Sequence, residues 1–418
     1  MLVKTILNQV QKFPSHVSDV VRFVGEGSRL ILEVGILPRA NGKILCSRCH
    51  RPAPGYDTAR EPRRFDFIPL WNIPVVFIYR MRRVDCRRCG GVYVEAVPWA
   101  DGKRRSTRAF SWFLASWARR LSWKETATVF HTSWDTVARS VRMAVDYGLA
   151  HRLVTGVRAI GIDEIAWKAG HQYLTLVYQI DVGCKRLLWI GEGRQEKTLE
   201  GFFEELGGAL ESLEFVASDM WKPYLNVVAR RAQDVLHVLD RFHIMSHFGK
   251  ALDKIRAQEV RELKSGGYEP VLKGSRFLLL KRPAGLTEKQ EAKLADLLRY
   301  NLKSTRAYLL KEEFQLFWDY VSPYWAGQFL DRWCRRTMRS RIDPAKKVAR
   351  SLRNHRELLL NWFRARREIS SGVVEGLNNK AKVTMRNAYG YRCYETLEAS
   401  LFHTMGKLPE PTFSHEFW

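Results

Sequence analysis

The sequence predicts a multidomain α+β protein in which a β-rich module and a helix-turn-helix precede an α/β core. This core contains a mixed five-stranded sheet and is interrupted by a long insertion with helical periodicity. Three observations predict this class. Two Cys-x-x-Cys pairs frame a short β-rich stretch, apolar runs and helices alternate in a defined order from Gly156 onward, and a long stretch with helical periodicity then separates this order from one more helix.

Composition limits the class of partner before any motif is considered. The chain has 418 residues, 69 Lys and Arg against 44 Asp and Glu, and a formal net charge of +25. This charge predicts a polyanionic partner, because cations that bind a polyanion release its counterions. With 46% hydrophobic residues the chain can bury a core, which excludes disorder as its main state. The apolar runs are too short to cross a bilayer and no signal peptide opens the chain, so we expect no membrane partner.

The cysteines predict a metal site rather than disulfides. The chain has seven cysteines, an odd number, and four of them form two identical pairs with two-residue spacing. Two such pairs give a closed tetrahedral site of four sulfurs, which suits Zn²⁺. We therefore expect one structural Zn²⁺ bound by Cys46, Cys49, Cys86 and Cys89. Four unrelated buried or redox-active thiols are the alternative.

Arginines are concentrated near the second cysteine pair. The eight that lie there are Arg60, Arg63, Arg64, Arg80, Arg82, Arg83, Arg87 and Arg88. A run of charge is often only a solvated face, but so many arginines beside a metal site are better explained by contacts to phosphates. The residues that we expect to contact nucleic acid are Arg82, Arg83, Arg87 and Arg88.

Residues 104–150 have the pattern of a helix-turn-helix. A first helix is expected from about Thr107 to Leu121, and Ser122-x-x-Glu125 is a capping box that begins a short second helix. After a three-residue turn, Ser133 can cap a third helix from Trp134 to about Val145. This arrangement places the third helix in the major groove of DNA. The side chains available for DNA contacts are Asp135, Thr136, Arg139 and Arg142. A plain three-helix bundle is the alternative.

At Gly156 the pattern changes to short apolar runs broken by glycine. Strands are expected at Val157–Ile165, Tyr173–Asp181, Arg186–Ile190, Glu214–Ala217 and Val235–Leu239, and helices at Leu199–Leu206, capped by Thr198, and at Tyr224–Ala232. The resulting order, β-β-β-α-β-α-β, is that of a ribonuclease H-like core.

Two carboxylates stand out in this order, since Asp163 lies in the first strand and Asp219 follows the fourth. A carboxylate on a buried strand is unfavourable unless it is paired, and a divalent metal ion pairs it well. Glu164 points to the opposite face of its strand, so Asp163 is the better candidate of the two. Asp181 and Asp240 also follow strands and are the main rivals.

A third carboxylate is expected on a helix that Ser370-Ser371-Gly372 can begin and that runs from about Val373 to Asn387. Glu375 lies on this helix, and the residues within about 40° of it around the axis are Asn379, Lys382 and Arg386. The carboxylates of Asp163, Asp219 and Glu375 could hold two Mg²⁺ (or Mn²⁺) ions, which activate an attacking oxygen and stabilise a leaving one. The neighbouring cations would hold the phosphates.

Taken together, these residues resemble a known family, the bacterial insertion-sequence transposases of the ISL-three family, which is a branch of the DDE transposases. The cysteine pairs and the helix-turn-helix resemble its DNA-binding half. Three segments resemble its catalytic motifs: Gly161-Ile162-Asp163-Glu164, Ser218-Asp219-Met220-Trp221-Lys222-Pro223-Tyr224, and Ser371-Gly372-Val373-Val374-Glu375-Gly376-Leu377-Asn378-Asn379-Lys380 followed by Ala388-Tyr389-Gly390-Tyr391-Arg392. The resemblance covers almost the whole chain.

The resemblance implies a transposase that binds the terminal inverted repeats of an insertion sequence, releases a 3′-OH by metal-dependent cleavage and transfers this end into target DNA. It also implies a homodimer or higher oligomer and a cytoplasmic, nucleoid-associated bacterial protein. Lys382 lies where many of these enzymes keep a basic residue near the cleaved strand, and Asp240-Arg241-Phe242-His243 resembles their D-x-x-H motif. The expected accessory residues are Asp240, His243 and Lys222.

Two alternatives to a transposase remain open. A zinc-containing helix-turn-helix regulator without catalysis would explain the N-terminal half and the charge, but it would leave the three acids without a role. A nuclease or resolvase with the same ribonuclease H-like core would cleave DNA without joining it.

The expected domain boundaries follow from these motifs. They are a segment of unclear role at 1–40, the zinc module at 41–100, the helix-turn-helix at 104–150, the two parts of the core at 156–243 and 368–408, the helical insertion at 244–367 and a tail at 409–418. Helical periodicity predicts helices at Glu288–Tyr300 and Glu312–Tyr320, and the resemblance implies that the insertion is an all-helical domain. It could contact DNA ends, a second copy of the chain, or both.

Positive charge is concentrated around the end of this insertion. The segment from Arg332 to Arg392 carries 17 basic and four acidic side chains. The interleaved tryptophans, Trp325, Trp333 and Trp362, are expected mostly in the core, with stacking of one of them on a distorted base as a hypothesis. The isolated cysteines Cys184, Cys334 and Cys393 are expected to be packing residues.

Overall fold

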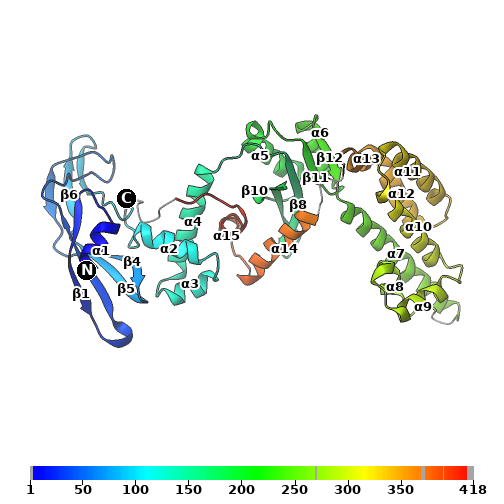
Figure 1. The fold of residues 1–418 in the computed structure, drawn as a ribbon, viewed down its shortest axis with the longest axis horizontal. Coiled ribbons are helices and arrows are strands. Elements are labelled where there is room, and N and C mark those ends of the chain that lie inside the picture. Colours follow the sequence, from blue (N-terminus) through cyan, green and yellow to red (C-terminus); the bar gives the residue numbers. More distant parts are fainter. Residues whose placement is uncertain (1–2, 269–270, 367, 369–371, 389, 412–418) are drawn as a thin grey trace. The chain divides into compact units, whose positions relative to one another are not determined.

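The computed structural model describes residues 3–268, 271–366, 368, 372–388 and 390–411 (Figure 1). The chain divides into two compact units, one formed by Met1–Leu153 with Val383–Trp418 and the other by Val154–Lys382. The observed fold is multidomain and α+β, as predicted. The two serines expected to begin the Glu375 helix, Tyr389 of the third motif and most of the predicted tail lie outside the described residues.

The first unit begins with a four-stranded sheet in the order β1-β2-β5-β4. The elements are α1 (Val3–Val10), β1 (His16–Val24), β2 (Ile31–Pro38), β4 (Arg63–Leu70) and β5 (Ile73–Tyr79). Aromatic rings fill its core, because Trp99 is fully buried and its ring lies within 6.4 Å of the rings of Phe13, Phe65 and Phe77. Residues 3–38, to which the sequence assigned no role, therefore supply half of this sheet.

The cysteine pairs lie on a smaller sheet in the order β3-β6-β7. Its strands are β3 (Gly55–Thr58), β6 (Arg82–Cys86) and β7 (Gly91–Val94). Its buried apolar cluster consists of only Cys46, Val84 and Cys86, with half-buried neighbours such as Ile44 and Tyr93. A core this small needs additional stabilisation, which a metal ion can supply.

Three helices follow, and the N-termini of the second and third are capped as predicted. They are α2 (Arg108–Trp117), α3 (Trp123–Val129) and α4 (Trp134–His151). Ser122 and Glu125 form the capping box of α3, and the Ser133 hydroxyl accepts the hydrogen bond of Thr136 N–H at the start of α4. α4 runs six residues beyond its predicted end, and its apolar stripe of Val137, Val141 and Val145 is buried.

The C-terminal helix α15 (Tyr394–Met405) packs against α4 in the same unit. A Cβ on Gly148 of α4 would lie 2.5 Å from Cβ of Leu408, so the chain after α15 passes very close to α4. The sequence had grouped α15 with the α/β core because of its place after the third motif.

The second unit contains the five-stranded mixed sheet, in the order β10-β9-β8-β11-β12. Its elements are β8 (Ala159–Lys168), β9 (Gln172–Asp181), β10 (Cys184–Glu192), α5 (Glu196–Leu206), β11 (Phe215–Ser218), α6 (Lys222–Arg231) and β12 (Leu236–Leu239). The predicted order of strands and helices is confirmed. Strands β8, β9 and β10 are antiparallel neighbours, whereas β11 runs parallel to both β8 and β12.

Thr198 does not cap α5, contrary to prediction. The N-cap is Gln195, and Thr198 lies in the first turn, where its hydroxyl donates a hydrogen bond to the Glu192 carbonyl. The sequence pattern failed here because five polar residues, from Arg194 to Thr198, stand in a row before the first buried leucine.

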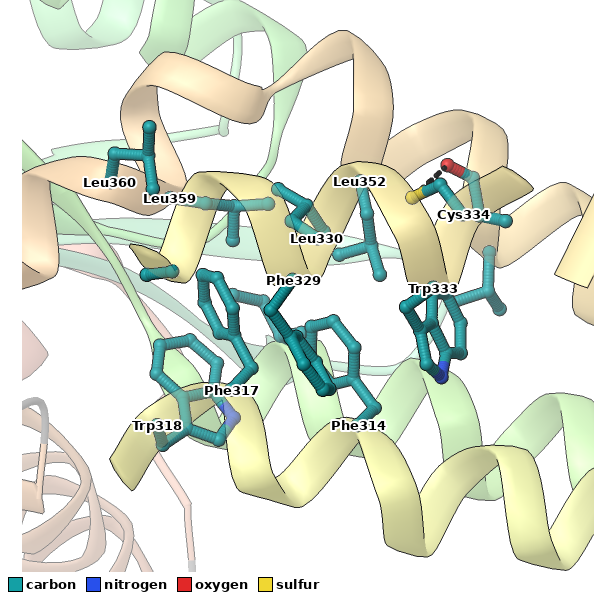
Figure 2. Close-up of a cluster of buried hydrophobic side chains, with 14 of the residues drawn as sticks. Phe314, Phe317, Trp318, Phe329, Leu330, Trp333, Cys334, Leu352, Leu359 and Leu360 are labelled. Atoms are coloured by element: carbon teal, nitrogen blue, oxygen red, sulfur yellow. Dashed lines mark hydrogen bonds between the residues drawn. The ribbon is translucent and has the colours of Figure 1, made fainter. Parts of the chain in front are cut away.

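From Arg241 to Arg364 the described residues of this unit form helices. They are α7 (Arg241–Ser265), α8 (Arg276–Leu280), α9 (Glu288–Leu297), α10 (Lys303–Gln315), α11 (Pro323–Met338), α12 (Asp343–Asn354) and α13 (Arg356–Arg364), with short 3-10 turns at Pro283–Gly285 and Leu316–Asp319. The helix expected at Glu312–Tyr320 is thus the end of α10 followed by a 3-10 turn. Figure 2 shows the core of these helices, in which the rings of Phe314, Phe317 and Trp333 pack together.

The tryptophans and isolated cysteines differ in burial. Trp333 is buried and Trp362 is half-buried against the same cluster, whereas 60% of Trp325 is exposed. Cys334 is a packing residue whose thiol lies 3.5 Å from the Ala349 carbonyl oxygen (Figure 2), but Cys393 is exposed, so the packing prediction is wrong for Cys393.

Within the described residues, no helix combines the length and the apolar character that a bilayer crossing requires.

One further helix, α14 (Gly372–Asn387), packs on the face of β8 that Gly161 leaves open. A Cβ on Gly161 would lie 2.3 Å from Cγ2 of Val374, so β8 and α14 approach each other as closely as they do because residue 161 has no side chain. Ile160 and Ile162 point to the other face, into the core that Phe202 and Tyr224 of α5 and α6 complete.

We predict that Gly161→Ala destabilises the protein by about 1–3 kcal/mol, the usual range for overpacking a core. Adding Val374→Ala removes the clashing Cγ2 and should recover much of this loss, which urea unfolding of the single and double variants would measure. The matched control is Gly183→Ala, because a Cβ there meets nothing within 4 Å. Equal destabilisation by both glycine substitutions would contradict the close packing of α14 on β8.

Candidate active site and metal centre

The register of three parallel strands places a row of carboxylates at one edge of the sheet. Ala217 pairs with Gly161, so Asp219 is level with Asp163, and Ser218 pairs with Leu239, so Asp240 follows β12 at the same level. Neighbouring strands lie about 4.8 Å apart. We call Asp163, Asp219 and Asp240 the carboxylate row.

Asp163 is held through both carboxylate oxygens. Its Oδ1 accepts a hydrogen bond from the backbone N–H of Glu164 at 2.7 Å, and its Oδ2 accepts one from Nδ2 of Asn378 at 2.5 Å. Tyr178 on β9 donates its hydroxyl hydrogen to Oδ1 of Asn378 at 2.8 Å, which fixes the orientation of the Asn378 amide. Helix α14 is therefore tied directly to the first carboxylate of the row.

Asp219 is held by the turn that begins α6. Its Oδ1 accepts a hydrogen bond from the backbone N–H of Trp221 at 2.9 Å. The Trp221 indole donates to the Arg194 carbonyl at 2.9 Å, and the Arg194 guanidinium forms an ion pair with Glu164 at 2.8 Å. Lys222, a predicted accessory residue, is the exposed first residue of α6.

Asp240 forms the N-cap of α7 and pairs with a histidine one turn later. Its Oδ1 accepts the hydrogen bond of Phe242 N–H at 2.7 Å, and its Oδ2 lies 2.8 Å from Nδ1 of His243. This hydrogen bond raises the pKa of His243 to about 9, with help from the charges of Asp163 and Asp219. The imidazolium thus places a positive charge beside the row at neutral pH.

The row is electrostatically strained without further positive charge. Burial is the main cause that raises the pKa of Asp163 to about 6, and the charges of Asp219 and Asp240 add to it, against the effects of the Glu164 N–H and of His243. Burial also raises the pKa of Asp219. Buried carboxylates that repel one another in this way are suited to a divalent cation, which stabilises their charged forms.

Glu375 lies on α14, one helical turn before Asn378, but its side chain is exposed. Asn379, Lys382 and Arg386 are exposed on the same helix, as their spacing predicted. Within the described part of the chain, only one set of three or more metal-binding side chains has its ligand atoms within 4.8 Å of one another. This set is the four cysteines of the two Cys-x-x-Cys pairs. The structure therefore brings Asp163, Asp219, Asp240 and His243 together and leaves Glu375 exposed on the helix that Asn378 ties to Asp163.

The four cysteines do form a metal-binding arrangement. The sulfurs of Cys46, Cys49, Cys86 and Cys89 lie within 4.8 Å of one another, and those of Cys49 and Cys86 are 3.7 Å apart. Zn–S bonds of about 2.3 Å in a tetrahedron require sulfurs roughly 3.8 Å apart, so the site has the dimensions of a zinc site.

The predicted arginine contacts of this module separate into two kinds. Arg82 is largely buried and donates to both carboxylate oxygens of Glu95 through its backbone and guanidinium, and Arg83 pairs with Asp57 across the strands. Arg82 thus stabilises the fold. Arg87 and Arg88 are exposed in the turn of the second cysteine pair.

On α4, the predicted contact residues have the expected exposure. Arg139 and Arg142 are exposed, and Thr136 is half-buried near the helix N-terminus. The neighbouring Val137 and Val141 are buried, so the arginines project from the side of α4 opposite its core.

The sequence did not indicate three residues that hold this site together. Asn378 could have been found, since it lies four residues after Val374 in the buried stripe of α14, where an amide is unusual. Arg194 and Tyr178 gave no such signal, because one follows a strand in a polar loop and the other lies within an apolar strand.

Comparison with known proteins identifies the family. The family model DDE_Tnp_ISL3, described as "Transposase", matches residues 160–401. The transposase for insertion sequence element IS1557 of Mycobacterium tuberculosis is 31% identical over 405 residues, which cover 91% of this chain and 89% of that protein. The transposase for element IS1001 of Bordetella parapertussis is 29% identical over 356 residues, which cover 84% of this chain and 86% of that protein.

Among solved structures, the Drosophila P element transposase strand transfer complex matches with a TM-score of 0.38 and 9% identity, over 72% of this chain and 92% of that one. The sequence matches, and not this distant likeness, establish the family. The chain belongs to the ISL-three family of insertion-sequence transposases.

Proposed function

We propose that this transposase binds the terminal inverted repeats of its insertion sequence, cleaves the DNA to release a 3′-OH and transfers that end into target DNA by a DDE two-metal mechanism. The observation that carries the proposal is the hydrogen bond of Asn378 to Asp163, because it ties the helix of Glu375 to the carboxylate row. The β-β-β-α-β-α-β order with strands 3-2-1-4-5 is that of a ribonuclease H-like core. A homodimer or higher oligomer remains part of the proposal, since two ends must be joined to one target.

Asp163, Asp219 and Glu375 would bind two Mg²⁺ or Mn²⁺ ions, with Asp240 as a neighbour of the site. Bound divalent ions supply activation of the attacking oxygen and stabilisation of the leaving oxygen. The Glu164 and Trp221 N–H groups orient the carboxylates of Asp163 and Asp219, and Asn378 fixes α14 against them. Lys382, Arg386 and Asn379 would contact the phosphates beside the cleaved bond, and His243 balances part of the negative charge of the row.

We predict that Asp163→Asn reduces cleavage of a labelled repeat-end DNA to background in Mg²⁺, because the isosteric amide cannot supply the metal-binding charge. Binding of the same DNA in EDTA should stay within about twofold of wild type. Asp181→Asn is the matched control, since Asp181 also ends a strand of the sheet, and it should retain cleavage.

Adding a target plasmid to the same reaction separates the alternatives to a transposase. Cleavage without strand transfer would favour a nuclease or resolvase. DNA binding without any cleavage by the wild-type protein would favour a regulator and contradict the proposed enzyme.

The cysteine quartet would hold one structural Zn²⁺ that stabilises the small sheet of β3, β6 and β7. Structural zinc contributes roughly 10–16 kcal/mol of apparent binding free energy, far more than the small apolar cluster at this site can supply. The ion would fix the turn that carries Arg87 and Arg88, and these arginines would contact DNA phosphates.

We predict one zinc per chain by metal analysis of the purified protein. Cys86→Ser should lose this zinc, lower the melting temperature and weaken binding of repeat-end DNA. Cys393→Ser, which changes an exposed cysteine outside the quartet, should alter none of the three. Retention of one zinc by Cys86→Ser would contradict the assignment.

Each unit would have a DNA-binding surface of its own, on α4 in the first unit and on the exposed face of α11 in the second. Arg139, Arg142 and Thr136 of α4 would contact the inverted repeat. Arg332 and Arg335 of α11 and its C-cap Arg339 are exposed on the side opposite the buried Leu330 and Trp333, and the described structure contains no ion pair for these arginines. Unpaired cations along one face repel one another, and a phosphate backbone would neutralise them.

We predict that the double substitution Arg335→Gln and Arg339→Gln lowers the slope of log K against log salt for duplex DNA by about 2, since each lost phosphate contact removes roughly 0.9. The matched control is Arg230→Gln with Arg231→Gln, because both of these arginines are exposed but paired with Glu200 on α5. An equal change in both double variants would show a general effect of net charge and contradict a contact at α11.

A further inference from the structure

We propose that Arg194 is a positioning residue for the carboxylate row, acting through the two residues whose backbone N–H groups hold Asp163 and Asp219. The inference rests on the proposed function, because it concerns the same metal-binding carboxylates.

The guanidinium of Arg194 is fixed on three sides. Its Nη1 donates to Oε1 of Glu164 at 2.8 Å, and its central carbon lies 4.0 Å from the ring centroid of Tyr173 and 4.7 Å from that of Trp221. A planar cation that stacks on aromatic rings and donates in its own plane is a property of arginine that lysine does not share. The loop between β10 and α5 thus presents Arg194 to three other segments of the core: β8, β9 and the turn before α6.

These contacts lead to both metal-binding aspartates. Glu164 contacts Arg194 through its side chain, and its backbone N–H donates to Oδ1 of Asp163. Trp221 contacts Arg194 through its ring and its indole N–H, and its backbone N–H donates to Oδ1 of Asp219. The two N–H donors that orient the carboxylates therefore belong to the two residues that Arg194 joins.

The surroundings of Glu164 support the same role. Its Oε2 is buried and has no hydrogen-bond partner, so Arg194 supplies the positive charge that this carboxylate needs. Loss of Arg194 would leave a partly buried anion unpaired and would free the Trp221 ring, and both changes would loosen the N–H donors. Loosened donors reduce the preorganisation of metal ligands, and such outer partners typically change metal affinity or activity by 10–100-fold.

The test is the affinity of the full chain for Mn²⁺ in the absence of DNA, measured by the electron paramagnetic resonance signal of free Mn²⁺. We expect Arg194→Gln to weaken Mn²⁺ binding by about 10–100-fold. Arg194→Lys should have an intermediate effect, because it keeps the charge but loses the stacked plane. Binding of repeat-end DNA in EDTA should stay unchanged in both variants.

The matched control is Arg158→Gln. Arg158 and Glu214 form an exposed bidentate ion pair between the residues that precede β8 and β11, at the other end of the same two strands. This variant should bind Mn²⁺ as wild type does. Trp221→Phe is a second variant. It keeps an aromatic ring at this position but removes the indole N–H donor, and it should weaken Mn²⁺ binding less than Arg194→Gln does.

Mn²⁺ affinity of Arg194→Gln within twofold of wild type, or an equal loss in Arg158→Gln, would overturn the inference. If Arg194→Gln does not fold, the same criteria apply to Arg194→Lys and Trp221→Phe. A wild-type protein that binds Mn²⁺ but cleaves no DNA would contradict the proposed function but not the inference. The ratio of the Mn²⁺ affinities of Arg194→Gln and wild type would still decide the role of Arg194. A wild-type protein without Mn²⁺ affinity would overturn both.

Discussion

Repulsion among the aligned carboxylates of Asp163, Asp219 and Asp240 is the constraint on which the rest of the second unit depends. The parallel register of β8, β11 and β12 makes their alignment unavoidable, because each acid occupies the same level of its strand. Without further contacts, these carboxylates would move apart or become protonated. The groups around them stabilise their charged forms in place. Two backbone N–H groups, an amide from α14 and a protonated histidine all point toward the row.

The same constraint explains why residues far apart in the chain converge at this edge. Asn378 is anchored by Tyr178, and α14 can approach because Gly161 leaves room for Val374. Each contact is ordinary by itself, but together they fix the position of a helix against a charged site. A single isolated carboxylate on the same strand would require none of them.

Sequence reasoning recovered the features that depend on local pattern. The capping residues Ser122 and Ser133, the order of strands and helices in the core and the two-residue spacing within each cysteine pair are all patterns of residues close together in the chain. The pairing of Arg82 with Glu95 was not predictable, because it depends on which strands become neighbours. The packing of α15 against α4, and the exposure of Glu375 beside a buried Asn378, likewise depend on long-range contacts that a single sequence does not reveal.

Asp240 belongs to the carboxylate row and is also the N-cap of α7, a helix of 25 residues that opens the helical region. The helical region therefore joins the core at the carboxylate row and not at a remote loop. Most of the helical region is thus structurally separate from the carboxylate row, but the N-cap and first turn of α7 are not. A change in the helices beyond His243 leaves the contacts of Asp240 in place, whereas a change in the turn from Asp240 to His243 alters the carboxylate row itself.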